Sequence, residues 1–298
     1  MIAPHIREDP VIVQDSGYAV GNFIECTPAI QAISKVIGKP VRVYFQSPHV
    51  QDMYLDCPFI DIMKAPPIGY ISRERSGTEV LFQSSDVNRY MPDHEFLYKT
   101  FACQIYGYEG AMPHSYVDPV EPPADREFPD GTLVGIVRGA RSERWHDAKD
   151  PGNYIYRMII DLMTMCTPTT VFPYLIGNED DYKWWMNDMK TWNPRITGCQ
   201  SNLIRHALGM LNAMDCVIAN DSGLYHAAVA LRKPTFVMWK NTDPIKNRAP
   251  GGYATHSIGK DNWMRDFGEW YEAYKKWAPA FMSIKGEIHA SPDTRSAN

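Results

Sequence analysis

The chain has 298 residues, of which 44% are hydrophobic and 22% charged, enough for one large domain or two ordinary ones with their own cores. No uninterrupted apolar stretch approaches the length of a membrane span, and the N-terminus lacks the basic start and long apolar region of a secretory signal. The six cysteines form no CxxC pair, so we expect reduced thiols in a cytoplasmic protein without a structural zinc site.

The net charge of −5 is unevenly distributed along the chain. Residues 1–125 carry 9 Lys/Arg and 16 Asp/Glu, a net charge of −7, whereas residues 126–298 carry the remaining 21 basic and 19 acidic residues, a net charge of +2. We therefore expect a phosphate-bearing ligand in the second half. The acidic first half argues against extensive nucleic-acid binding, although a local basic groove would be compatible with it.

The first half begins with an expected βαβ unit. Residues 11–13 predict a short strand, Thr27-Pro28 has the pattern of a helix N-cap and first helical residue, and residues 41–45 alternate like a strand. Farther along, we expect a strand over 80–82 and a helix over 95–106 whose aromatic side chains lie in the core.

A stretch rich in proline and acidic residues separates this region from the second half. Its lack of apolar periodicity indicates an extended linker. We place an N-terminal domain at 1–120, the linker at 121–130 and a C-terminal domain at 131–260. Residues 261–298 are expected to form an aromatic-rich helix, able to pack back on the N-terminal domain, and a polar tail.

The second half alternates between strand and helix patterns. Strands are expected over 133–137 and 170–176, and helices over 153–164 and 203–211. Pro173 inside the second of these strands either weakens that assignment or marks a bulge. The alternation predicts a doubly wound α/β domain with a parallel sheet.

The stretch from Cys216 to Asp243 carries the strongest functional signal of the chain. Residues 216–219 form a short apolar run typical of a buried strand, which Asn-Asp-Ser-Gly at 220–223 interrupts with turn and N-cap residues. A helix and a second apolar strand at 235–239 follow. The helix N-terminus after such a strand offers free amides and a favourable dipole to an anion, and His226 in the first turn is close enough to contact it.

The same stretch resembles the C-terminal signature of glycosyltransferase family 9, the ADP-heptose:lipopolysaccharide heptosyltransferases. The pattern D-[ST]-G-x-x-H-x-A-x-A, a Pro-led strand and a TDP element are matched by Asp221, Ser222, Gly223, His226, Ala228, Ala230, Pro234 and Thr242-Asp243-Pro244. Near the N-terminus, GNFIECTPAIQAI is similar to a second family segment. Between them, GIVRGARSERWHD is similar to the element that opens the family's C-terminal domain.

The resemblance implies an α/β protein with the GT-B fold, in which two Rossmann-like doubly wound domains face a cleft. It also implies an inverting, metal-independent transfer of a sugar from a nucleotide-diphospho-sugar to an acceptor hydroxyl, without a cofactor. The acceptor, an envelope saccharide by family default, would bind the N-terminal domain, and the donor the C-terminal domain. Such an enzyme stabilises the leaving diphosphate and needs a general base.

The resemblance assigns donor-binding roles to residues of the second half. Ser222, Gly223 and His226 would contact the diphosphate or its sugar, and Asp221 would orient the turn or bind a donor hydroxyl, a role compatible with capping the helix. Thr242 would contact the nucleotide or simply belong to a turn.

A second donor element is the basic loop that follows the strand at 133–137. The family's phosphate-binding Lys falls at Glu143 or Arg144, depending on the gap. Arg138, Arg141 and Arg144 crowd this loop, and one of them could clamp the diphosphate, unless the loop is merely a solvated basic surface.

The expected general base departs from the family pattern. The family's acidic residue aligns with Asn22, whose amide cannot accept a proton at neutral pH. Either Asp15 or Glu25 replaces it, or the base is absent. We prefer Asp15 because it follows the strand at 11–13, although an ordinary loop-capping aspartate is an equal reading.

Alternative functions remain open at this point. The acceptor could be a hydroxylated pyrimidine in phage DNA, or the chain could be a non-catalytic nucleotide-sugar binder, which Asn22 would explain. A GT-B sugar epimerase fits the transfer signature less well. The acidic run at 179–181 could suggest a metal site, but a charged helix start is the better interpretation.

Overall fold

The computed structural model describes residues 10–14, 20–66, 93–139, 152–166, 170–179, 181–182, 197–200, 203–239, 242, 247–249 and 256–257. Within these ranges, no helix is both long enough and apolar enough to cross a membrane. The strand expected over 80–82 and the C-terminal helix expected after 261 lie outside the described residues.

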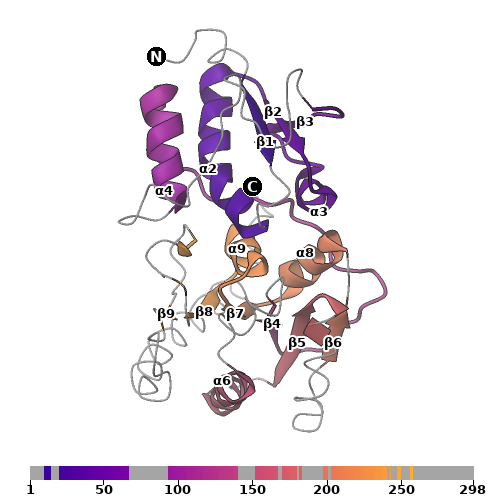
Figure 1. Ribbon diagram of the computed structural model, residues 1–298. Coiled ribbons are helices and arrows are strands. Elements are labelled where there is room, and N and C mark those ends of the chain that lie inside the picture. The colour runs from indigo at the N-terminus through magenta and orange to yellow at the C-terminus, as the bar shows by residue number, and fades with distance from the viewer. Residues whose placement is uncertain are drawn as a thin grey trace, which may run out of the picture.

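The first half contains a parallel three-stranded sheet with the order β1-β2-β3 (Figure 1). Its strands are β1 (Val11–Gln14), β2 (Val41–Phe45) and β3 (Ile60–Ile62). The 18-residue helix α2 (Val20–Ile37) lies between β1 and β2 in the chain. The sequence-based expectations for β1 and β2 are confirmed. Strand β3 was not predicted, because its three residues are too few to show a period.

Helix α2 starts seven residues earlier than the expected N-cap at Thr27, so that prediction was wrong. Pro28 lies inside the helix and has no N–H to donate to the carbonyl of Ile24. The hydroxyl of Thr27 donates to that carbonyl oxygen instead, at 2.7 Å. The Thr27 hydroxyl therefore replaces the backbone donor that Pro28 lacks in the middle of the helix. Because Thr-Pro is also a common pair at the start of a helix, the sequence pattern alone did not distinguish the two positions.

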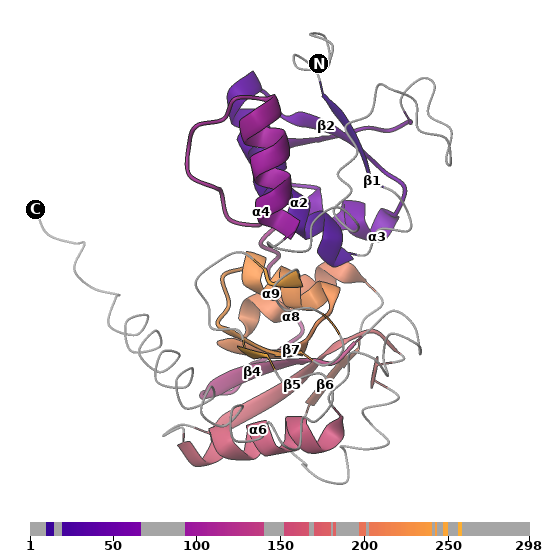
Figure 2. The same cartoon turned by 60° about the vertical axis from the view of Figure 1, so that its left-hand side comes forward.

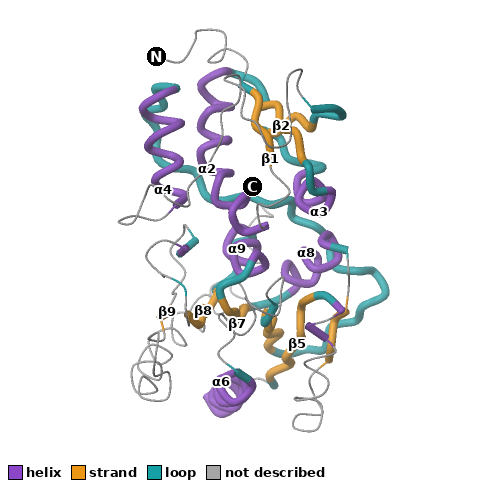
Figure 3. Tube along the Cα trace, in the orientation of Figure 1, coloured by secondary structure: helices purple, strands orange, loops and turns teal. Residues whose placement is uncertain are grey.

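Two further helical segments complete the first half. A short helix α3 (Pro48–Gln51) leads into the 3₁₀ turn η1 (Asp52–Tyr54). Helix α4 (Asp93–Leu97) continues as the π-helical segment η2 (Tyr98–Ile105) and packs beside α2. This confirms the helix expected over 95–106, although its wider π turns were not predicted. An irregular segment, teal in Figure 3, then runs to the second half.

The second half is built on a six-stranded parallel sheet with the order β6-β5-β4-β7-β8-β9. The strands are β4 (Thr132–Val137), β5 (Val171–Gly177), β6 (Thr197–Gln200), β7 (Cys216–Asn220), β8 (Thr235–Trp239) and β9 (His256–Ser257). Helix α6 (Asn153–Cys166) covers one face, and α8 (Ile204–Ala213) and α9 (Gly223–Ala230) cover the other (Figure 2). The predicted doubly wound domain is confirmed, and its strand order reverses between β4 and β7.

Pro173 lies within β5 without the bulge that the sequence suggested. Its register with β4 is continuous, with Pro173 opposite Val134 and Tyr174 opposite Gly135. On its other side, β5 pairs with β6 only from Tyr174 onward. The missing N–H of proline is therefore tolerated, because the regular pairing with β6 begins after it.

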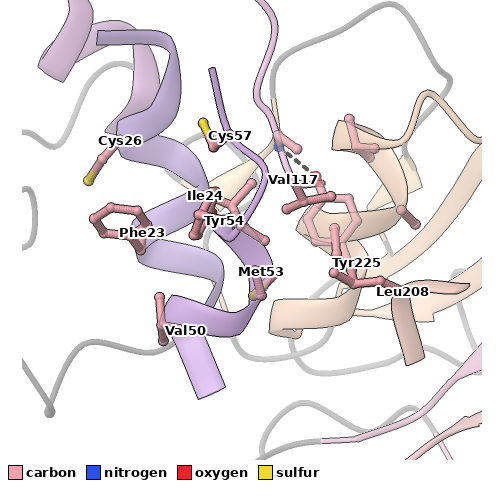
Figure 4. Close-up of a cluster of buried hydrophobic side chains, with 14 of the residues drawn as sticks. Phe23, Ile24, Cys26, Val50, Met53, Tyr54, Cys57, Val117, Leu208 and Tyr225 are labelled. Carbon is pink, nitrogen blue, oxygen red and sulfur yellow. Dashed lines mark hydrogen bonds between the residues drawn. The ribbon is translucent and has the colours of Figure 1, made fainter. Parts of the chain in front are cut away.

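The two halves share one apolar core at their junction. Figure 4 shows Met53, Tyr54 and Val117 of the first half beside Leu208 and Tyr225 of the second, and Phe23 belongs to the same cluster of buried side chains. Phe23 contacts Tyr54 edge to face, with ring centroids 5.1 Å apart. Because these side chains are buried from both sides, the relative position of the halves is stabilised by the same hydrophobic burial that stabilises each half.

Arg205 on α8 adds a polar connection between the halves. Its guanidinium lies 3.2 Å from Asp118 Oδ2 and 2.9 Å from Asp56 Oδ2, and it donates to the carbonyl of Asp52 at 3.2 Å. Asp118 also accepts the backbone N–H of Asp56, at 2.8 Å. Burial raises the pKa of Asp118, while these two donors act in the opposite direction.

Replacing Arg205 with alanine should destabilise the protein by about 2 kcal/mol, because a buried carboxylate loses its charged partner. The loss is smaller than for a fully buried pair, since the Arg205 side chain is 33% exposed. Chemical denaturation would measure it. The matched control is Arg157→Ala, which removes an exposed pair with Asp161 and should change stability by at most about 0.5 kcal/mol. Equal losses for both variants would contradict the structural role of Arg205.

Candidate functional site

The candidate site lies where β7 ends and α9 begins, next to the reversal of strand order between β4 and β7. Ligands of open α/β sheets bind at such a reversal, outside the carboxyl ends of the strands. The strand prediction for 216–219 is confirmed, and β7 extends to Asn220. Asn220 is fully buried, and neither its amide nitrogen nor its amide oxygen has a hydrogen-bond partner. A buried amide left in this state is costly unless a ligand completes its hydrogen bonds.

Ser222 is the residue before the first helical residue of α9, as expected for an N-cap. Its backbone is extended, with φ −147° and ψ 166°, but its side chain makes no capping hydrogen bond. The buried Oγ has no hydrogen-bond partner, and the same is true of Oγ1 of Thr242. The Ser222 hydroxyl and the first amides of α9 are therefore suited to receive an anionic ligand.

His226 lies in the first turn of α9 and is buried between two carboxylates. Its Nδ1 is 3.7 Å from Oε1 of Glu25 on α2, and its Nε2 is 4.0 Å from Oδ1 of Asp221. Both separations are longer than a hydrogen bond but short enough for a strong electrostatic attraction when the imidazole is protonated. Asp221 and His226 were predicted from the sequence as donor-binding residues, whereas Glu25 was considered only as a possible base.

Glycines allow the N-terminal ends of α2 and α9 to approach each other closely, as Figure 1 shows. A Cβ on Gly21 would lie 2.7 Å from Cδ2 of His226, and a Cβ on Gly223 would lie 2.9 Å from Cβ of Val20. Neither position has room for a side chain. Gly223 was expected to contact the donor; in the structure it packs against Val20 of α2. The role of Gly21 was not predicted.

The remaining predicted site residues are Asn22, Asp15 and three arginines of the loop after β4. Asn22 is exposed in the first turn of α2, and its carbonyl accepts the Sγ–H of Cys26 at 3.2 Å. Arg138 is buried after β4, with its guanidinium carbon 5.5 Å from the ring centroid of Tyr156 on α6. Asp15, Arg141 and Arg144 lie outside the described residues.

The acidic run at 179–181 is partly described and starts a helical turn. Asp181 accepts the backbone N–H of Asn178 at 3.0 Å, while the Asn178 side chain accepts the backbone N–H of Asp181 at 2.8 Å. This reciprocal pair is a capping box, in line with the expected charged helix start.

His94 on α4 is a site neighbour that the sequence analysis missed. It is buried, and burial together with the charges of His226 and Arg248 lowers its pKa from 6.5 to about 3. Arg248 also lies 3.7 Å from Glu95, and the next residue, Ala249, donates its N–H to the hydroxyl of Tyr225 at 2.6 Å. The chain around 248 therefore connects α4 with α9.

Comparisons with known proteins agree with this architecture. The family model of glycosyltransferase family 9 (heptosyltransferase) matches residues 201–275, which include the candidate site. No curated protein matches the chain by sequence.

Several solved structures are similar over most of the chain. A glycosyl transferase family 9 protein from Veillonella parvula has 12% identity and a TM-score of 0.66 over 92% of this chain and 97% of its own. ADP-heptose LPS heptosyltransferase II of E. coli has 12% identity and a TM-score of 0.61 over 89% and 98%. E. coli heptosyltransferase WaaC with ADP has 13% identity and a TM-score of 0.60 over 87% and 98%.

The fold is therefore that of the GT-B glycosyltransferases, as expected. The resemblance to glycosyltransferase family 9 is confirmed by the family match over 201–275, and this match supports glycosyltransferase activity.

The buried state of His94 predicts a loss of stability in mild acid. The unfolded chain, with an ordinary His pKa of 6.5, takes up a proton that the folded protein excludes down to about pH 3. The free energy of unfolding should therefore fall as the pH decreases below 6.5, by about 2 kcal/mol from this residue at pH 5. Denaturation of His94→Asn between pH 7 and 5 should show a shallower slope. The exposed His49, changed to Asn, is the control that should retain the wild-type slope.

Proposed function

We propose that the protein is an inverting, metal-independent glycosyltransferase that binds a nucleotide-diphospho-sugar and transfers its sugar to a hydroxyl of a saccharide acceptor in the cytoplasm. The observation that carries the proposal is the pair of residues at the junction of β7 and α9, Asn220 and Ser222, whose buried polar side-chain atoms have no hydrogen-bond partner. Both residues lie within residues 201–275, the part of the chain that the family model matches.

The donor diphosphate fits the N-terminus of α9. The helix dipole and the first-turn amides favour negative charge, and the Ser222 hydroxyl is available to donate. As the sugar leaves, charge builds up on the diphosphate, so donors already directed at it stabilise the transition state more than the ground state. This arrangement provides the electrostatic part of catalysis without assigning a step to a metal. ADP-sugars are the first donors to test, since E. coli WaaC was solved with ADP.

The general base is the second element of the proposed mechanism. Asn22 stands at the family's acidic position and cannot serve as that base. Glu25 is buried and faces His226, which makes it a poor candidate for receiving a proton from an acceptor hydroxyl. We assign the base to Asp15, which directly follows β1 in the chain.

The alternatives differ in their support. The matched family and structures give no support to a DNA acceptor. A non-catalytic nucleotide-sugar binder would also use the α9 site, but it would not consume the donor. Turnover that depends on an acceptor separates the two functions.

The test combines a thermal-shift screen of ADP-, UDP-, GDP- and dTDP-sugars with a transfer assay on saccharide acceptors. The bound donor should raise the melting temperature of the wild type. His226→Ala should weaken donor binding by about tenfold or more, the value of one charge-assisted contact. Asp15→Asn should retain donor binding and lose transfer. His206→Ala, on α8, is the control that should behave as the wild type in both assays.

Three outcomes would contradict the proposal. The first is the absence of stabilisation by any nucleotide-sugar. The second is unchanged donor binding in His226→Ala, which would remove the site assignment. The third is donor binding without turnover on any acceptor, which would favour the non-catalytic binder.

A further inference from the structure

Glu25 is a buried carboxylate that the proposed chemistry leaves without a role. It lies on α2 in the first half of the protein, with 3% of its surface exposed. A carboxylate in such surroundings is expensive unless a cation or a hydrogen-bond donor faces it. One group that faces it belongs to the other half of the chain: Nδ1 of His226, 3.7 Å from Oε1 of Glu25.

The ring of His226 is constrained from several sides. Gly21 of α2 lies against its edge, because a Cβ there would come within 2.7 Å of Cδ2 and 3.2 Å of Nε2. The ring of Tyr225 is also adjacent, with the two centroids 4.5 Å apart. The orientation of this candidate donor-binding side chain is thus constrained by Gly21 and Glu25 of α2 as well as by Tyr225 of its own helix.

The two ring nitrogens have different surroundings. Nδ1 points toward Glu25, and Nε2 lies 4.0 Å from Asp221, at the turn where the donor is proposed to bind. A carboxylate that holds the Nδ1–H fixes the tautomer and the ring plane, so that Nε2 is directed at the ligand. The 3.7 Å separation can shorten when a ligand is bound, as long contacts in unliganded sites commonly do.

We propose that Glu25 is a positioning residue that holds His226 from across the junction of the two halves. This inference rests on the proposed function of the α9 site. It assigns α2, on the proposed acceptor side, a direct influence on the donor side. Donor affinity and transfer rate would therefore depend on how closely α2 and α9 approach each other, in addition to the contacts that each makes separately.

A double-mutant cycle of Glu25→Gln and His226→Ala tests the proposal. Glu25→Gln should lower kcat/KM for the donor by about tenfold in the wild-type background, within the range for residues in direct contact. In the His226→Ala background the same change should have no further effect. Glu25→Asp should recover part of the loss. Ile30→Val removes a buried carbon from the same helix and should leave kcat/KM unchanged, which controls for altered packing of α2.

A second readout does not depend on activity. Nitrogen NMR of the His226 side chain should show a changed tautomer or protonation state in Glu25→Gln and the wild-type state in Ile30→Val. Equal effects of Glu25→Gln in both His226 backgrounds, or an unchanged His226 spectrum, would overturn the inference. If the wild type neither binds nor consumes any donor, the proposed function fails, and the spectrum alone decides the role of Glu25.

Discussion

The close contact between the N-terminal ends of α2 and α9 is the constraint on which the rest of this structure depends. Two glycines make it possible, since a side chain at either position would collide with the facing helix. The contact places a residue pair from opposite halves, Glu25 and His226, in a buried environment where charge interactions are stronger than in water. A shared apolar core and the Arg205 ion pairs then stabilise this arrangement.

The candidate site follows from this constraint and from the topology of the second sheet. Strand order reverses between β4 and β7, and such a reversal leaves a crevice at the carboxyl ends of the strands. Helix α9 begins just after β7, so the positive end of its dipole lies at this edge of the sheet. Polar atoms that would normally be satisfied in a folded core are left unpaired at this point, on Asn220 and Ser222. Unsatisfied groups cost stability, and such costs are typical of sites that await a ligand.

The sequence predicted those parts of the protein that depend on local patterns. The βαβ unit around 216–239 was predicted almost to the residue, because apolar runs and an Asn-Asp-Ser-Gly break mark its elements. The start of α2 was predicted wrongly, because Thr27-Pro28 lies inside the helix although the same pair commonly begins one. The Thr27 hydroxyl there supplies the hydrogen bond that Pro28 cannot donate. The partnership of Glu25 with His226 and the burial of His94 arise from contacts between distant segments, which no residue spacing along the chain records.

The decisive experiment is a crystal structure of the protein with ADP, or with the nucleoside diphosphate of whichever donor the screen selects. We expect the diphosphate at the N-terminus of α9, within hydrogen-bonding distance of the Ser222 hydroxyl and the Nε2 of His226. We also expect the Glu25–His226 separation to shorten from 3.7 Å to a hydrogen bond. A nucleotide bound elsewhere, with the unpaired groups at Asn220 and Ser222 unchanged, would contradict this expectation.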